Sequence, residues 1–158
     1  MKVTPVGKRL SKVERAYIAG FIDADGAIMA IIEKHTEKKF GFRIRVVLKA
    51  TQANPRILRW LCKKSQAGLV RKNRTTYDWL VRNQKDIRSL LIALTPYFKV
   101  KNRQTVKALQ LLNGTINSPK ELMIAARLAD SLAKLNVRSK NRRINFAPMI
   151  QGKRSRND

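Results

Sequence analysis

Two acidic residues two positions apart, Asp23 and Asp25, form the first pattern in this chain that could support chemistry. They lie in the segment IDADG, where apolar Ile22 precedes the acids and Gly26 follows them. If this segment ends a helix, both carboxylates face the negative end of the helix dipole, at a cost of roughly 0.3–1 kcal/mol each. A divalent cation offsets that cost, because it binds carboxylate and carbonyl oxygens together. The pattern therefore predicts a metal site at a helix end.

Two other interpretations of this acidic pattern need weighing. The acids could be solvated charges at a helix end, because most Asp residues in proteins are exposed to solvent. A calcium-binding EF-hand loop also begins with DxDG, but it requires glycine at its sixth position and glutamate at its twelfth. Those positions hold Ile28 and Lys34 here, which excludes an EF-hand. The metal and solvated-acid interpretations both stay open at this point.

The charge of the chain indicates what kind of partner it has. Its 158 residues include 35 Lys and Arg against 10 Asp and Glu, a formal net charge of +25. Such an excess repels itself unless the partner is a polyanion, so nucleic acid is the leading partner. A ribosomal-type RNA binder would be equally basic, so charge alone says nothing about catalysis.

Cysteine and histidine are too few for several kinds of site. Cys62 is the single cysteine and His35 the single histidine, so neither an internal disulfide nor a His/Cys metal cluster can form. A lone thiol suits a reducing compartment, and we expect an intracellular location, in the cytoplasm, the nucleoid or an organelle. No apolar run is long enough to cross a bilayer. We therefore expect no membrane partner, and no small-molecule cofactor.

The element that carries the acids is predicted to be a helix with one face of small residues. Ser11 and Glu14 form a capping box, and the helix runs to about Ala24. Small residues recur every four positions on one face, which lets a second helix approach closely. The chain holds one such helix, so we expect a homodimer about a twofold axis. The predicted dimer interface comprises Ala16, Ala19, Gly20, Asp23 and Ala24.

The remaining periodicity predicts an α+β domain. Strands are expected at 27–33 and 42–51, and again at 69–73 and 76–82, in adjacent pairs typical of an antiparallel sheet. Helices are expected after 54–55 and at 85–94, 101–112 and 118–135, covering one face of that sheet. We divide the chain into a basic N-terminal arm (1–10), one domain (11–145) and a basic C-terminal tail (146–158).

The other face of this sheet mixes basic, acidic and amide side chains. Such a mixture suits direct base readout, because Arg bonds guanine, Asn bonds adenine, and acids accept from cytosine. The predicted base-facing residues are Ile31, Glu33, His35, Arg43, Arg45, Lys49, Arg71, Asn73, Asp78, Leu80 and Arg82. The residues predicted to hold phosphates are Lys38, Lys39, Arg138, Lys140, Arg142 and Arg143. Each of these could individually be an ordinary solvated residue.

Residues 18–26, IAGFIDADG, resemble the LAGLIDADG signature of homing endonucleases. The string departs from it only by Ile18 for Leu and Phe21 for Leu, and the predicted layout agrees from about Ser11 to Asn145. The resemblance implies an α-β-β-α-β-β-α core with a saddle-shaped antiparallel sheet and extra C-terminal helices. It also implies a homodimer that cuts both strands of a long pseudo-palindromic DNA site with short 3′ overhangs, promoting intron homing. Mg²⁺ is the implied cofactor, and Mn²⁺ or Ca²⁺ would substitute for binding.

Site residues carry over from this resemblance one at a time. Asp25 matches the metal-binding acid, and Ala24 matches the position whose carbonyl reaches the metal. Thr51-Gln52 with Arg56 resembles a family segment that orders water and phosphate, and residues 96–104 resemble a segment that supplies a pocket lysine, Lys101. For Asp23 two roles stay open: it could bind the metal, or it could serve the end of the helix instead. The predicted catalytic set is Asp25, Gln52, Arg56 and Lys101.

Two other functions remain as alternatives. A non-cleaving binder on the same scaffold, such as an RNA maturase or a DNA-binding regulator, would keep the charge and the fold. A ribosomal-type RNA binder would explain the charge but not the small-residue helix that ends in DADG. No protein-splicing segment is recognisable beside the domain, so we expect a free-standing, intron-encoded enzyme.

Overall fold

A computed structural model describes residues 6–136 and 146–151. Strands and helices alternate in the order that the periodicity predicts, with one further helix at the end. The elements are α1 (Lys12–Asp25), β1 (Gly26–Lys34), β2 (Phe42–Gln52), α2 (Arg56–Ser65), β3 (Leu69–Asn73), β4 (Thr76–Val81), α3 (Gln84–Leu94), a 3₁₀ turn η1 (Thr95–Tyr97), α4 (Asn102–Asn113), α5 (Pro119–Asn136) and α6 (Phe146–Gln151).

The four strands form one antiparallel sheet in the order β1-β2-β4-β3. The register pairs Ile28 with Leu48, and Leu48 with Val81, so these apolar residues share one face. On the opposite face, Lys49 is paired with Leu80 and Thr51 with Asp78. Alternation along each strand therefore separates an apolar face from a mixed polar face, as the sequence predicts.

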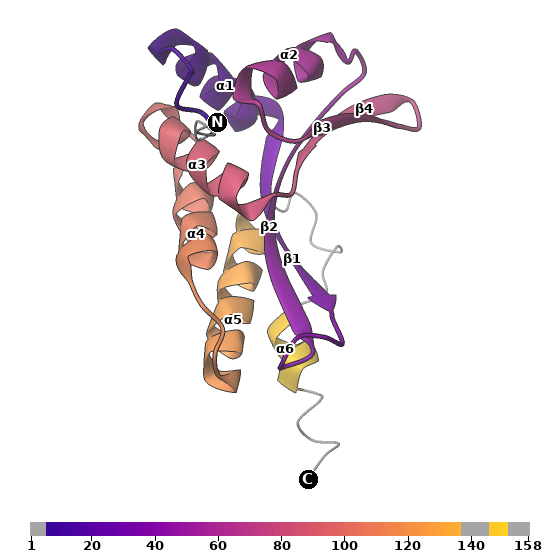
Figure 1. The fold of residues 1–158 in the computed structure, drawn as a ribbon, viewed down its shortest axis with the longest axis vertical. Helices are drawn as coiled ribbons and strands as arrows, with labels where there is room; N and C mark the ends of the chain where they lie inside the picture. Colours follow the sequence, from indigo (N-terminus) through magenta and orange to yellow (C-terminus); the bar gives the residue numbers. More distant parts are fainter. Residues whose placement is uncertain (1–5, 137–145, 152–158) are drawn as a thin grey trace, which may run out of the picture.

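Helices cover the apolar face of the sheet. Figure 1 shows α3, α4 and α5 along one side of the long β1–β2 pair, with α1 and α2 at its upper end. Ile18 and Ile22 of α1 are fully buried with Leu48 and Trp79 of the sheet in one hydrophobic core. The Trp79 indole also donates to the Ala67 carbonyl, at 2.9 Å. This packing holds the end of α1 at the border of the sheet.

The domain is larger at both ends than the predicted boundaries allow. Leu10 is buried in the core and Val6 packs against it, so the described part of the N-terminal arm belongs to the domain. Residues 146–151 form α6 instead of a tail, and Ile150 packs with Phe42 and Leu122. The sequence lacked a clear apolar period over these six residues, and tertiary packing decides their structure.

The helices are too short or too polar to cross a membrane throughout the part of the chain that the structure describes.

Candidate nucleic-acid interface and metal site

The junction between α1 and β1 places the acids of the signature. Gly26 ends α1, and its N–H donates to the Ile22 carbonyl. A Cβ at Gly26 would lie 2.8 Å from the Ile22 Cα and 2.9 Å from its carbonyl oxygen, which no side chain tolerates. Glycine therefore permits an abrupt change from helix to strand. The turn leaves Asp25 at the last position of the helix and at the edge of the sheet.

Asp25 has an exposed carboxylate with little compensation from its own chain. Gln52 Nε2, from the last residue of β2, donates to Asp25 Oδ2 at 2.9 Å. Among the described residues this amide is the only side-chain partner of Asp25, and no cation pairs with it. The structure thus brings together two of the predicted catalytic residues. Asp25 therefore presents an accessible carboxylate whose negative charge no cation of the described chain neutralises.

Asp23, two residues earlier, is used within the chain. Its carboxylate accepts three backbone N–H groups, from Lys99 (2.7 Å), Val100 (3.2 Å) and Lys101 (2.9 Å). These residues lead into α4. The carboxylate of Asp23 is therefore engaged within its own chain, and the contribution of Asp23 to a dimer interface stays a prediction.

Lys101 and Arg56, the other two predicted catalytic residues, differ in their contacts with the end of α1. Lys101 Nζ donates to the backbone oxygen of Asp23 at 2.7 Å, which places the ammonium at the same end of α1 as Asp25. Arg56 is exposed at the start of α2, where its N–H donates to Asn54 Oδ1. Within the described chain, its guanidinium has no bond to Asp25, Gln52 or Lys101. Lys101 is bonded to the end of α1, whereas the side chain of Arg56 makes no such bond within the described chain and lines the same groove as Gln52.

The outward face of β1 and β2 carries a charged pair. Glu33 and Arg45 form an ion pair of 2.5 Å on this face. The side chain of Arg45 is 19% exposed, so the carboxylate of Glu33 fixes its guanidinium in one place. Arg43 is partly exposed on the same face, and its partner in the register is Glu33. The predicted orientation of these three residues agrees with the register.

The outward face of β3 and β4 centres on Asp78, which has no exposed surface. Asp78 accepts from Thr51 Oγ1 at 2.6 Å and Asn73 Nδ2 at 3.0 Å, and pairs with Lys49 Nζ at 3.1 Å. Arg71 Nε lies 3.8 Å from the same carboxylate. We call Asp78, Thr51, Lys49, Asn73 and Arg71 the Asp78 cluster.

Two predicted base contacts on this half of the sheet are wrong. Asp78 is buried and bonded on both oxygens, so it cannot accept from a base. Leu80 is 6% exposed, which leaves it almost no surface for a thymine methyl. Alternation correctly placed both on the outward face, but it did not reveal that both are buried there.

The other predicted DNA contacts vary in accessibility. Lys38 and Lys39 are exposed in the loop between β1 and β2, and Arg82 is exposed after β4. His35 follows β1, and its buried Nδ1 has no hydrogen-bond partner among the described residues. The four cations Arg138, Lys140, Arg142 and Arg143 lie outside the described residues.

One side of α1 faces away from the core and carries the small residues. Ala16, Gly20 and Ala24 are exposed, and a Cβ added to Gly20 would meet nothing within 4 Å. Ala19 is fully buried, so its assignment to a dimer interface is wrong. A glycine inside a helix lowers stability by roughly 0.5–1 kcal/mol relative to alanine. At Gly20 no contact within the described chain requires a glycine, because a Cβ there would meet open space.

Apolar side chains extend this exposed side of α1 toward its start. Val13 is 79% exposed and Tyr17 is 51% exposed, and they precede Gly20 and Ala24 at helical spacing. Tyr17 packs edge-to-face on Trp60 of α2, with ring centroids 5.2 Å apart. Our sequence predictions missed Val13, Tyr17 and Trp60, although the 13-17-20-24 spacing could have identified the first two.

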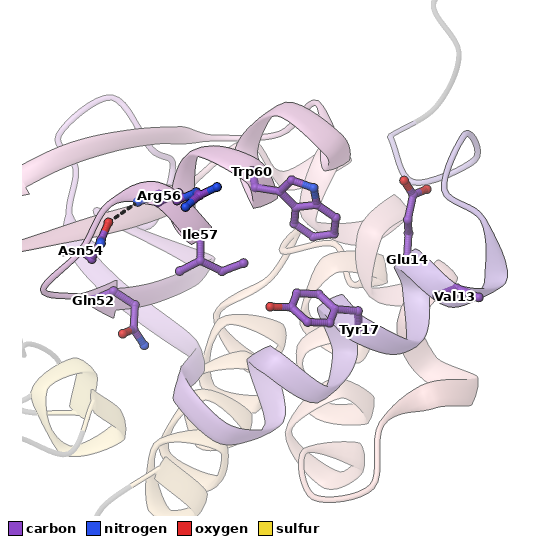
Figure 2. A pocket seen from close by; sticks show the side chains of 8 residues that line it. All are labelled: Val13, Glu14, Tyr17, Gln52, Asn54, Arg56, Ile57 and Trp60. Atoms are coloured by element: carbon purple, nitrogen blue, oxygen red, sulfur yellow. Dashed lines mark hydrogen bonds between the residues drawn. The ribbon is translucent and has the colours of Figure 1, made fainter.

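A groove of about 640 Å³ separates α1 from the segment 52–60. Figure 2 shows Val13, Glu14 and Tyr17 on the α1 side of it. The opposite side is lined by Gln52, Asn54, Arg56, Ile57 and Trp60. Arg56 and Gln52 therefore lie on the same wall of the groove. Because Gln52 also donates to Asp25, the groove extends from the exposed side of α1 to the carboxylate of Asp25.

Comparison with known proteins identifies this arrangement. A family model described as LAGLIDADG endonuclease matches residues 18–116, more than half of the chain. The chain belongs to the LAGLIDADG endonuclease family. The match contains the α1 signature, the outward strands and Lys101, and it confirms the resemblance seen at residues 18–26.

Curated and solved members of the LAGLIDADG family agree with this assignment. DNA endonuclease I-CreI of Chlamydomonas reinhardtii is 30% identical over 127 residues, 76% of this chain and 77% of the relative. DNA endonuclease I-CvuI of Chlorella vulgaris is 34% identical over 125 residues, 76% of this chain and 78% of the relative. The crystal structure of I-CvuI with an I-CreI DNA target and Mg has a TM-score of 0.82 and 31% identity, covering 92% of this chain and 94% of that one. The DNA-bound archaeal I-Vdi141I shares the fold, with a TM-score of 0.77 at 23% identity, over 89% of this chain and 96% of that one.

Proposed function

We propose that this protein is a site-specific DNA endonuclease that hydrolyses phosphodiester bonds with a divalent metal ion. The observation that carries the proposal is the exposed carboxylate of Asp25, which has Gln52 as a partner and no cation, at the border of a cationic sheet face. Both curated relatives are DNA endonucleases, and I-CvuI has been solved with an I-CreI target in the presence of Mg, with the DNA not cleaved, and with its own target in the presence of Ca. Charge, site and relatives all agree with this reaction.

The donor set at the end of α1 suits Mg²⁺. Within the described residues no three His, Cys, Asp or Glu side chains lie close enough to enclose a metal. Mg²⁺ does not need such a cage, because it keeps several waters and is often held by one or two carboxylates with substrate phosphates. Asp25 would hold the ion by its carboxylate, and Ala24 by a carbonyl in the last turn of α1, where carbonyls lack helical partners. The bound ion supplies water activation and charge stabilisation at the attacked phosphate.

Three other residues would act around the phosphate. Gln52 orients the carboxylate of Asp25 through its amide and can order a water molecule with the same group. Lys101 brings a positive charge to the end of α1, where it can stabilise negative charge that develops on the phosphate. Arg56 is free to swing from the start of α2 and to bind a phosphate oxygen when DNA is present.

Cutting two strands needs two such sites, and the chain has one. A homodimer through α1 would bring two copies of Asp25 close together on either side of a twofold axis. Gly20 supports this contact, since its missing Cβ has no use within the monomer. The exposed apolar residues Val13 and Tyr17 would extend the same interface along the helix.

The dimer would read a long, nearly palindromic target. Twofold symmetry repeats the outward sheet face on each half-site, so the DNA halves must resemble each other. The family resemblance further implies short 3′ overhangs and a role in intron homing. Both are part of the proposed function and depend on the cleavage reaction.

Selection of cleaved sites from a random DNA library, with Mg²⁺ present, tests the proposal. We expect the cleaved sites to share one long sequence whose two halves are similar, and the products to carry short 3′ overhangs. The Asp25→Asn protein, assayed under the same conditions, should give no product. Binding to one sequence without cleavage at any metal concentration would refute the nuclease assignment. That result would instead favour a non-cleaving binder on the same scaffold.

A further inference from the structure

The two acids of the signature have opposite surroundings. Asp25 is exposed and bonds only to Gln52 among the described residues, whereas both oxygens of Asp23 accept backbone N–H groups from residues 99–101. The contacts of Asp23 join residues 76 to 78 positions apart in the sequence. Asp23 therefore connects the end of α1 to the start of α4.

The connection between Asp23 and Lys101 is reciprocal. The carboxylate of Asp23 holds the backbone N–H of Lys101 at 2.9 Å, and the ammonium of Lys101 donates to the backbone oxygen of Asp23 at 2.7 Å. Each residue thus uses its side chain on the backbone of the other. Two bonds across one pair restrict the path of Lys101 far more than a single contact with a flexible lysine would.

Electrostatics at the two helix ends favours the same arrangement. An acid in the last turn of α1 is unfavourable there, but the segment 99–101 presents backbone N–H groups to it just before α4 begins, next to the positive end of the α4 dipole. The carboxylate of Asp23 is compensated by that segment. In return, the ammonium of Lys101 meets the negative end of α1, which has no basic residue of its own in its last turn. Asp25 alone is left for a metal ion.

We propose that Asp23 is a positioning residue that fixes Lys101 at the metal-binding end of α1. It touches neither metal nor DNA, and it acts through the segment 99–101. The position of Lys101 is a property of the free protein. Its importance for cleavage rests on the proposed function.

The free protein tests the positioning itself. Asp23→Asn replaces one acceptor oxygen with an NH₂ group that faces backbone donors. We expect amide hydrogen exchange at residues 99–101 to speed up by about tenfold or more. Reductive methylation of Lys101, followed by mass spectrometry, should speed up as well. Ser11→Ala is the matched control, since it removes a cap at the other end of α1. The proposal is overturned if Asp23→Asn leaves both rates at residues 99–101 within about twofold of Ser11→Ala.

Cleavage of the selected DNA site tests the consequence. We expect Asp23→Asn to lower the single-turnover rate by about tenfold or more, with DNA affinity in Ca²⁺ unchanged, and to add less than about twofold in a Lys101→Ala background. An equal loss in both backgrounds would show that Asp23 acts independently of Lys101, and would overturn the proposal. If the wild-type protein cuts no DNA, the proposed function fails, while exchange and methylation still decide whether Asp23 fixes Lys101.

Discussion

Two acids near the proposed DNA surface, Asp25 at the end of α1 and Asp78 on the sheet, have opposite environments. Asp25 is exposed, with one amide partner and no cation among the described residues. Asp78 is fully buried, hydrogen-bonded to Thr51 and Asn73, and paired with Lys49. The fold compensates the charge of Asp78 within the chain and leaves the carboxylate of Asp25 exposed with a single amide partner.

The difference separates two roles for acids in a very basic protein. Burial by itself would raise the pKa of Asp78, but hydrogen bonds from Thr51 and Lys49 outweigh it and hold the pKa below its ordinary value. The ionised carboxylate therefore keeps Lys49, Asn73 and Arg71 together on the outward face, while Asp25 has no such cations to arrange. The compensated acid organises its neighbours, and the uncompensated acid is the one that we propose as a metal ligand.

The largest expected effect comes from Asp25→Asn. Loss of the metal ligand should reduce DNA cleavage by about a thousandfold or more, because metal stabilisation of the transition state is worth several kcal/mol. The free energy of unfolding without metal should stay the same or rise by about 0.3–1 kcal/mol, since an acid at the C-terminal end of a helix is removed. Single-turnover cleavage and urea denaturation measure the two quantities.

DNA binding by Asp25→Asn, measured in Ca²⁺, serves as the control for this prediction. We expect specific binding to survive, because the sheet face is unchanged. A variant that lost both cleavage and binding would show that Asp25 supports the fold or the DNA surface, and the contrast with Asp78 would disappear.

The fold was largely predictable because its signals are local. The capping box at Ser11 and Glu14 starts α1 as expected. Strict alternation over 42–51 placed Arg43 and Arg45 on the outward face, and the register agrees. The helix α6 was missed, because its structure depends on packing between Ile150 and residues more than twenty positions away.

The candidate site was predictable only in part, because partners across elements leave no trace in a single sequence. The family resemblance pointed to Asp25, Gln52 and Lys101, but neither it nor the spacing could show that Asp23 binds residues 99–101. Nor could alternation reveal that Asp78 is covered by Lys49 and its neighbours. A residue's face follows from local geometry, whereas its exposure depends on the lengths of side chains from other strands.

The next largest effect should come from Asp78→Asn. The substitution keeps the volume of the side chain but leaves Lys49 and Arg71 without their carboxylate. We expect the free energy of unfolding to fall by about 1–3 kcal/mol, the usual cost of an unsatisfied buried polar group. Urea denaturation measures it. Glu33→Gln is the matched control, because Glu33 is a partly exposed acid that also pairs with an arginine, and we expect it to cost less than about 1 kcal/mol.

The contribution of Asp78 should depend on pH. Its folded pKa lies below the ordinary value of 3.8, so the folded state binds its proton more weakly than the unfolded state does. The stabilisation is therefore complete above about pH 3.8 and is lost as the pH falls through the folded pKa. Unfolding curves of the wild type and Asp78→Asn should converge below pH 3.8. A constant difference down to the acid limit would mean that shape, and not charge, stabilises the Asp78 cluster.

Arg45→Ala should test whether the β1–β2 half of the outward sheet face recognises bases, in contrast to the half around Asp78, where the acid is buried. Arg45 is held by Glu33 in one orientation, which suits a bidentate bond to guanine. We expect a loss of about 1–3 kcal/mol of discrimination at one base pair in each half-site. Binding to a set of singly substituted targets measures it. Equal losses at every base would reject Arg45 as a reader and leave it as a phosphate contact.

The smallest expected effect comes from Lys38→Ala in the loop between β1 and β2. Lys38 is exposed and has no acid partner among the described residues, so nothing fixes it for reading a base. We expect weaker binding to all DNA sequences alike, with the salt dependence of the affinity reduced by about one ion per subunit. Titrations of target and random DNA at several salt concentrations measure both. If affinity fell for the target DNA alone, the loop would read sequence. A lysine without an acid partner could then recognise a base, as we expect Arg45 to do with its guanidinium fixed by Glu33.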